Sequence, residues 1–343
     1  MPDRPDNRPM TPLRLRSVLH SLLRFACLAA ATLAVSAQAQ PRECKPNPPE
    51  VARLVSVVGN FYSVDGPLAH FDPCHRSVDL SLPWGAERPP LMIVVHGGAG
   101  IDAATKGAVS AFRSAGFATL VFDAFEMNGF YQGPGFWSTS ATNESRQRMI
   151  FKVALGAYEW ARQQARIDNR RIVLHGLSNG GPSVLNVAAL ADPAHVRGVL
   201  AEGSPSAGIG LPLALKVPTR MVYGRLDNYG GVDEQDWMWT RTGRCAINMP
   251  SPEAAPGTAT DCSRFVRFHE SMPTPQAWYE ARKAEGAPIE WVWLDETAHG
   301  AFGGPLTRRM VHYTNGNRRM AWVGGTSAAR DQLVKLAKEL VQP

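Results

Sequence analysis

The sequence has little cysteine and none of the common metal or nucleotide motifs, and each shortage excludes a class of site. Only five of the 343 residues are cysteine, and neither C-x-x-C nor H-E-x-x-H spacing occurs, which argues against a zinc site. Neither G-x-G-x-x-G nor G-K-[ST] is present, so the glycine-rich segments do not follow the phosphate-binding patterns. We therefore expect the protein to need no metal or organic cofactor.

A hydrophobic run near the N-terminus is too short to span a bilayer. It covers the thirteen residues 25–37, whereas a spanning helix needs about 20. Five arginines precede it and the small residues Ala37 and Ala39 end it, an order typical of a secretory signal peptide. We expect residues 1–39 to be removed near Ala39, which would leave a periplasmic or secreted protein with no stable membrane anchor.

Positive charge is in small excess once this leader is set aside. Residues 1–39 hold five arginines and two aspartates, so the formal net charge falls from +6 to +3 without them. No Lys/Arg cluster with interleaved aromatic residues remains, which argues against a nucleic-acid partner. The 44% hydrophobic and 19% charged composition is that of a globular protein with a large core. The oligomeric state stays unknown.

Four cysteines remain beyond the leader, in two sequence-local pairs. In an oxidising compartment such pairs usually form disulfides. Of three possible connectivities we favour Cys44–Cys74 and Cys245–Cys262, because each closes a short loop. Each bridge is expected to contribute about 3 kcal/mol by restricting the unfolded chain. Buried free thiols are the alternative.

Strand and helix patterns alternate along the chain, which predicts a mostly parallel central sheet with helices on both faces. The expected strands are 75–83, 91–98, 117–123, 171–175, 196–204, 219–224 and 289–294, the first of them antiparallel. The expected helices are 104–116, 143–166, 179–190, 275–284 and 326–341. Periodicity disappears over about 236–272, which we interpret as a disulfide-bearing insertion. We expect one domain over residues 40–343.

The segment Gly176-Leu177-Ser178-Asn179-Gly180 lies between a strand pattern and a helix pattern. G-x-S-x-G in this context predicts a nucleophile elbow, a sharp turn that presents the serine hydroxyl at the start of the next helix. The two glycines are expected to remove collisions with the neighbouring strand and helix. The pattern indicates Ser178 as a nucleophile; a serine that only caps the helix is the alternative.

A serine nucleophile needs a base and an orienting carboxylate. Asp227 follows the strand that ends at Gly224, and His299 follows the strand that ends at Leu294. Both would lie at the carboxyl ends of strands, where ligands bind in such sheets. We therefore predict a catalytic triad of Ser178, Asp227 and His299.

Other residues compete for these roles. The alternatives are Asp233, Asp236 and Asp295 for the acid, with Asp233 the next choice, and His269 and His312 for the base. His96 and His175 end central strands and precede the serine, so we interpret them as core histidines. The oxyanion donors are expected to be the backbone N–H groups of Asn179 and Gly98, with Ala99 as the alternative to Gly98.

Aromatic residues gather in two segments that could roof a pocket: Phe130, Tyr131, Phe136, Trp137, Trp237 and Trp239. A pocket roofed in this way favours an aromatic or apolar acyl group, while aromatic cover for a core edge fits the pattern equally well. Arg225 is a candidate partner for a substrate carboxylate, although a salt bridge within the protein is the favoured interpretation. The substrate-binding candidates are thus Tyr131, Trp137 and Arg225.

Four segments together resemble the α/β-hydrolase superfamily and, within it, the dienelactone hydrolase-like branch. They are VVHGGAG (94–100), GLSNGG (176–181), GRLD (224–227) and AHGAF (298–302), in order within about 76–303. The resemblance implies an α/β-hydrolase fold and a hydrolytic triad. Dienelactone hydrolase carries a cysteine nucleophile where this chain has Ser178, which points to a general serine esterase. GLSNGG also resembles secreted polyester depolymerases and feruloyl esterases.

The expected activity is hydrolysis of a small or polymeric carboxylic ester through an acyl-enzyme. A peptidase of the same fold and a non-catalytic binding protein that keeps the elbow are the alternatives. The sequence does not identify the natural substrate.

Overall fold

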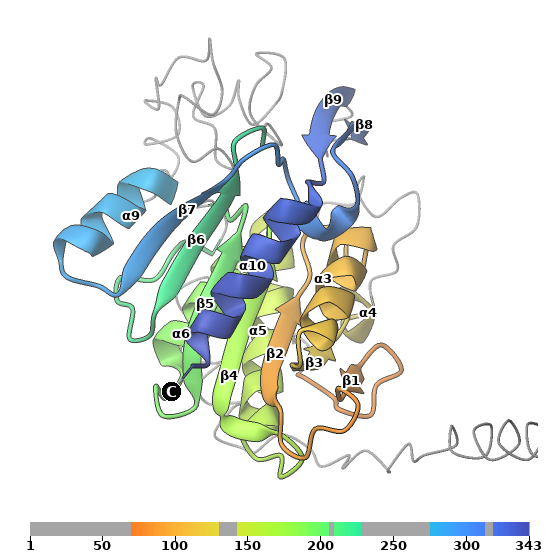
Figure 1. Cartoon of the computed structure of the whole chain (residues 1–343), viewed down its shortest axis with the longest axis vertical. Helices are drawn as coiled ribbons and strands as arrows, with labels where there is room; N and C mark the ends of the chain where they lie inside the picture. The colour runs from red at the N-terminus through yellow and green to blue at the C-terminus, as the bar shows by residue number, and fades with distance from the viewer. Residues whose placement is uncertain (1–69, 130–142, 206–208, 228–274, 313–317, 343) are drawn as a thin grey trace, which may run out of the picture. The chain divides into compact units, whose positions relative to one another are not determined.

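The computed structural model describes residues 70–129, 143–205, 209–227, 275–312 and 318–342. Within them, a seven-stranded sheet has the order β1-β3-β2-β4-β5-β6-β7 (Figure 1). The strands are β1 (Asp79–Ser81), β2 (Pro90–Val95), β3 (Ala118–Val121), β4 (Asp168–Leu177), β5 (Val196–Glu202), β6 (Thr219–Gly224) and β7 (Ile289–Leu294). In this sheet β1 pairs antiparallel with β3, and the other pairs are parallel.

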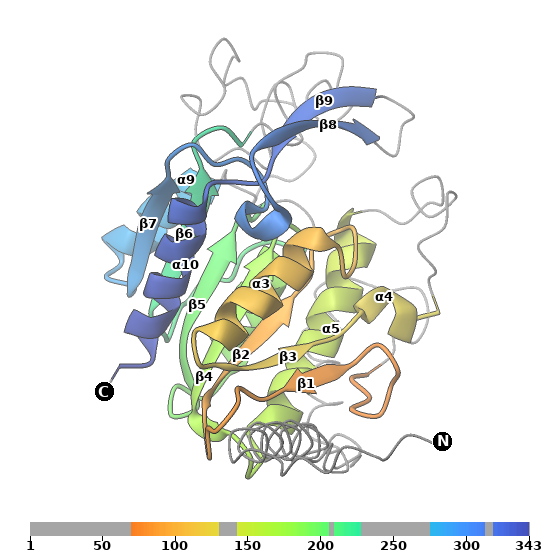
Figure 2. The same ribbon diagram turned by 45° about the vertical axis from the view of Figure 1, so that its right-hand side comes forward.

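Helices cover both faces of the sheet (Figures 1 and 2). Helices α3 (Ala103–Ser114) and α10 (Ser327–Leu340) pack on one face, and α5 (Asn143–Ala161) and α6 (Gly180–Leu190) pack on the other. The short α4 (Ala124–Met127) and α9 (Pro275–Ala284) contribute to the same core as α5 and α6. The predicted fold class, a mostly parallel sheet between two helical layers, is therefore confirmed.

The continuous apolar run of β2 follows from this layering. Met92 and Val94 belong to the core under α3 and α10, whereas Leu91, Ile93 and Val95 belong to the core under α5 and α6. All five side chains are buried. A strand buried on both faces has no solvent side, so its sequence does not alternate between apolar and polar residues.

Most predicted boundaries lie within a few residues of the observed ones, and β6, β7 and α9 match. Helix α5 ends at Ala161, five residues before the predicted end at Arg166. Its last turn tightens, because the N–H of Gln164 donates to the carbonyl of Ala161. The side chain of Asn169 then binds the carbonyl of Arg162 at 2.7 Å, which takes up an acceptor that a continuing helix would use.

A hairpin near the C-terminus was not predicted. It consists of β8 (Thr307–His312) and β9 (Arg318–Val323), which pair antiparallel with each other, and a short 3-10 helix, η3 (Ala301–Gly303), precedes it. Val323 forms a parallel bridge with His299. The hairpin thus anchors the segment that carries a predicted catalytic residue.

Several predictions concern residues outside the described part of the chain. These are the signal peptide over 1–39, the insertion over 236–272, and the cysteines Cys44, Cys245 and Cys262. Cys74 is among the described residues, but every other cysteine lies outside them, so both pairings remain predictions. No helix in the described ranges has both the length and the hydrophobicity to cross a membrane.

Candidate active site

Ser178 occupies a strained turn between β4 and α6. Its φ is 53°, in the left-handed region that residues other than glycine rarely adopt. Two backbone hydrogen bonds hold the turn: the N–H of Ser178 donates to Glu202 O at 2.8 Å, and the N–H of Gly181 donates to Ser178 O at 2.8 Å. Such strain persists only where the surrounding structure enforces it, and it is often found at functional sites.

The glycines on either side of Ser178 allow backbone to pack directly on backbone. A Cβ at position 176 would lie 2.3 Å from Gly180 O and 2.6 Å from Val184 Cγ2. A Cβ at position 180 would lie 2.6 Å from His96 O and 2.7 Å from Val95 O. The elbow therefore needs glycine at both positions, the first against the helix start and the second against the end of β2.

Asp227 and His299 are joined by a buried hydrogen bond. Nδ1 of His299 lies 2.8 Å from Oδ2 of Asp227, and the two side chains are 9% and 1% exposed. The loops that carry them also contact each other, since Leu226 N–H donates to Thr297 O at 2.9 Å. A Cβ on Gly224 would lie 2.3 Å from the same carbonyl oxygen. The ends of β6 and β7 thus hold the pair together.

The charges around His299 favour its protonated form. Burial lowers the pKa of the imidazole, but the charge and hydrogen bond of Asp227 raise it, and the charges of Glu202 and Asp102 raise it further. The net result is a pKa above the ordinary value of 6.5. A base with a raised pKa binds a proton more strongly, which suits proton abstraction from a hydroxyl.

The end of β5 brings His299 and Ser178 to the same edge of the sheet. A Cβ on Gly203 would lie 2.9 Å from both Cε1 and Nδ1 of His299. Glu202, the residue before Gly203, accepts the N–H of Ser178. The imidazole and the serine backbone therefore contact adjacent residues, and the three predicted triad residues come from the carboxyl ends of β4, β6 and β7.

Asp295 and Arg225 take other roles. Nε of Arg225 lies 2.6 Å from Oδ1 of Asp295, and their side chains are 55% and 83% exposed. The Arg225 guanidinium also lies 5.1 Å from the ring centroid of Trp293. The arginine thus forms the internal salt bridge that the sequence favoured over a substrate contact, and Nδ1 of His299 binds Asp227 rather than Asp295.

Other candidate residues lie outside the described part of the chain, so the structure does not bear on them. They are Tyr131, Trp137, Asp233, Asp236, His269 and the remaining aromatic residues of the two loops. The side chain of His312, at the end of β8, is likewise outside it. Where side chains are described, no three His, Cys, Asp or Glu residues are grouped to hold a metal ion.

The loop after β2 packs against the elbow. The backbone N–H of Gly100 donates to Gly97 O at 3.2 Å, so residues 97–100 form a tight turn. A Cβ on Gly97 would lie 3.1 Å from the Cβ of Ser178. This close approach places the loop that contains Gly98, a predicted oxyanion donor, beside Ser178.

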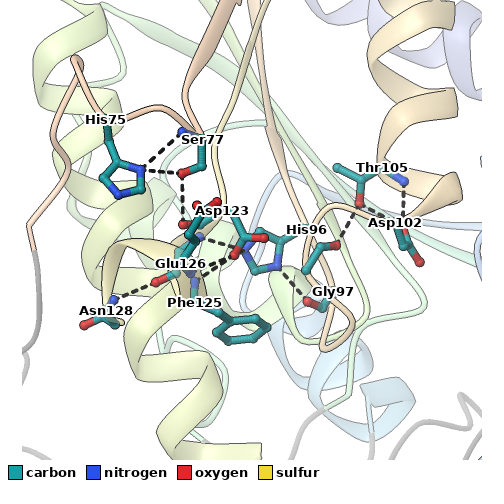
Figure 3. Close-up of polar contacts among 12 residues, drawn as sticks. His75, Ser77, His96, Gly97, Asp102, Thr105, Asp123, Phe125, Glu126 and Asn128 are labelled. Carbon is teal, nitrogen blue, oxygen red and sulfur yellow. Dashed lines mark hydrogen bonds and ion pairs between the residues drawn. The ribbon is translucent and has the colours of Figure 1, made fainter. Parts of the chain in front are cut away.

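His96 fixes the start of this loop (Figure 3). Its Nε2 accepts the N–H of Ala124 at 3.0 Å, so the proton is on Nδ1, which lies 2.7 Å from Gly97 O and donates to it. Burial lowers the pKa of His96 despite opposing contributions from Asp123, the Gly97 carbonyl and Asp102. A neutral, doubly hydrogen-bonded ring matches its interpretation as a core histidine.

Gln147 on α5 was not predicted and holds the second oxyanion candidate. Its Nε2 donates to Oδ1 of Asn179 at 3.1 Å, and its Oε1 accepts the N–H of Ile209 at 2.9 Å. The Asn179 side chain is thus fixed while its backbone N–H lies at the start of α6. The sequence offers no signal for this role, because a lone glutamine in a helix fits no catalytic pattern.

The order of these elements identifies the fold. A parallel sheet with one antiparallel strand at its edge carries a strained Ser178 after β4, an aspartate after β6 and a histidine after β7. This is the α/β-hydrolase fold. In it, the carboxyl ends of the central strands form the site.

Comparisons with known proteins give distant matches. No family model matches the chain. It is 34% identical over 118 residues to an uncharacterised 31.7 kDa protein of the traX-finO intergenic region of Escherichia coli, a match that covers 33% of this chain and only 37% of that relative. The chain also aligns with solved structures of similar α/β-hydrolase proteins. With dienelactone hydrolase from Anabaena variabilis it shares 17% identity, and the alignment covers 77% of this chain and 89% of that one with a TM-score of 0.42. With Thermogutta terrifontis esterase 2 it shares 15% identity, and the alignment covers 78% of this chain and 90% of that one with a TM-score of 0.44.

Proposed function

We propose that this protein is an exported serine hydrolase that cleaves carboxylic esters with Ser178, His299 and Asp227. The observation that carries the proposal is the buried 2.8 Å bond between His299 and Asp227, at the sheet edge where Ser178 is held at φ 53°. A buried carboxylate on Nδ1 fixes the tautomer whose Nε2 can accept a proton. It also stabilises the imidazolium that forms when that proton arrives.

The reaction then follows the triad logic. The Ser178 hydroxyl oxygen attacks the ester carbonyl carbon while its proton passes to Nε2 of His299. The tetrahedral intermediate collapses, the C–O bond to the alcohol breaks, and the imidazolium returns the proton to the leaving alkoxide. Water then attacks the acyl carbon while His299 takes its proton, the bond to the Ser178 oxygen breaks, and the imidazolium returns the proton to Ser178 as the carboxylic acid leaves.

The developing oxyanion needs donors that are held in place before the reaction begins. We assign the backbone N–H groups of Asn179 and Gly98, with Ala99 as the alternative to Gly98. Support comes from the Gln147 contact that fixes Asn179 and from the turn at 97–100 packed on Ser178. The N-terminus of α6 adds its favourable dipole.

The proposed enzyme is exported and acts on an ester. The signal-peptide pattern over 1–39 supports a periplasmic or secreted enzyme. The triad chemistry uses neither a metal nor an organic cofactor, so the partner we assign is the ester itself, small or polymeric.

Covalent labelling tests the proposed chemistry. We expect a fluorophosphonate probe to label the wild-type protein, Ser178→Ala to abolish labelling, and His299→Ala to reduce p-nitrophenyl ester turnover by about 10³-fold or more. Ser327→Ala, at an exposed serine at the start of α10, should leave both unchanged. Turnover of aminoacyl amides rather than esters would favour a peptidase, and a folded wild-type protein that resists the probe would refute catalysis.

A further inference from the structure

A buried carboxylate outside the proposed triad lies at the end of β5. Glu202 is 3% exposed, and β5 is otherwise a strand of mainly apolar, buried residues. A buried charge is costly unless it is well paired. The partners of Glu202 therefore indicate what its carboxylate is for.

Glu202 contacts both sides of the candidate site. Its backbone carbonyl accepts the N–H of Ser178 at 2.8 Å. Its carboxylate Oε1 accepts the N–H of Ala301, two residues beyond His299, at 2.6 Å. One residue thus binds the turn that carries the nucleophile and the segment that carries the base.

His175 completes the arrangement from β4. Its Nε2 lies 3.0 Å from Oε2 of Glu202, and its ring packs edge-on against Phe112 and Phe302, with centroids 5.4 and 5.9 Å away. In the described part of the chain, its Nδ1 has no hydrogen-bond partner. The ring therefore binds the carboxylate in a buried environment next to aromatic side chains, where such a bond is strong.

We propose that Glu202 is a positioning residue for the reaction, which sets the placement of His299 relative to Ser178 through its contacts with Ala301 and the elbow. This inference rests on the proposed function, because it assigns a role within that site. His175 holds the Glu202 carboxylate in the orientation that reaches Ala301.

Charge provides a second line of support. Around His299, burial lowers the pKa, while Asp227, Glu202 and Asp102 raise it. The base must be neutral to accept a proton, so kcat/KM should fall as pH drops through this raised pKa. Removing the Glu202 charge should lower the pKa of His299, and the acid limb of the pH profile of kcat/KM should then move to lower pH.

Two substitutions separate position from charge. Glu202→Gln keeps the shape and an oxygen for the Ala301 N–H, so kcat on the pH plateau should stay within about threefold while the acid limb moves to lower pH. Glu202→Ala removes both side-chain contacts, so kcat should fall roughly 10- to 100-fold with KM nearly unchanged. Glu87→Gln, at an exposed residue, is the matched control and should move neither quantity.

The outcomes distinguish this inference from the proposed function. If the wild type reacts with the fluorophosphonate but Glu202→Ala turns over like it, or Glu202→Gln leaves the acid limb in place, the positioning role is wrong and the hydrolase stands. If the wild type does not react, the proposed function itself fails. Should Glu202→Ala not fold, as judged by its unfolding transition, the acid limb of Glu202→Gln decides alone.

Discussion

Two aspartates show how environment assigns roles to identical side chains. Asp227 is buried and bonded to His299, whereas Asp295 lies only four residues before His299 but is largely exposed and paired with Arg225. Sequence distance favours Asp295, and strand order favours Asp227. The structure agrees with strand order. The carboxyl ends of β6 and β7 are neighbours in the sheet, which brings Asp227 within hydrogen-bond distance of His299.

This contrast gives a matched pair of substitutions. Asp227→Asn keeps the shape but loses the carboxylate that orients the imidazole, so we expect kcat to fall about 10³- to 10⁴-fold. Asp295→Asn breaks only an exposed salt bridge, which is worth little, and should leave kcat within about twofold. Steady-state ester hydrolysis at the pH plateau measures both; equal losses in the two variants would contradict the assignment of Asp227.

At the scale of elements, the elbow depends on how closely β2, β4 and α6 approach each other. A Cβ at Gly180 would meet two backbone oxygens of β2 and the loop after it, at 2.6 and 2.7 Å. Backbone atoms cannot rotate away as side chains do, so relief requires the strand or the helix to move. The placement of Ser178 is therefore coupled to the packing of α6.

Two glycine substitutions test this coupling. Gly180→Ala should cost roughly 2 to 3 kcal/mol in the free energy of unfolding, as overpacking typically does, and should reduce labelling of Ser178. Gly303→Ala is the control, because its Cβ would lie 3.5 Å from Ala104 Cβ, an ordinary contact, and its effect should stay within about 0.5 kcal/mol. Denaturant unfolding compares them, and a Gly180→Ala protein as stable as the control would contradict the packing argument.

Elements with strong local patterns were predictable from the sequence, and those held by long-range contacts were not. The strands β2, β4 and β6 appear as apolar runs because they are buried within the sheet. The hairpin of β8 and β9 has arginines at positions 308, 309, 318 and 319, so its strands carry no buried-strand pattern. Glu202 carried one usable signal, an acidic residue at the end of an otherwise apolar strand.

At the scale of the whole molecule, the candidate site is assembled from residues far apart in the sequence. The placement of Ser178, Asp227 and His299 at neighbouring strand ends was predictable, because the order of elements fixes which strand ends meet and motif context supplies that order. Gln147 and Glu202 were not assigned roles, because their contacts, to Ile209 and Ala301 among others, depend on the tertiary placement of loops. Sequence patterns thus locate the candidate reacting groups better than the residues that hold them in place.

Oxidation state should affect the stability of the whole protein. If Cys44–Cys74 and Cys245–Cys262 are both formed, each restricts the unfolded chain and contributes about 3 kcal/mol, so reductant should lower the melting temperature by several degrees. Once the leader has been removed, the oxidised protein should show no titratable thiol. A Cys44→Ser/Cys74→Ser double variant should melt lower and lose only part of its sensitivity to reductant, since the second bridge remains. Four titratable thiols in the native protein, with a melting temperature that reductant does not move, would contradict both bridges, and peptide mapping without reduction would identify a different pairing.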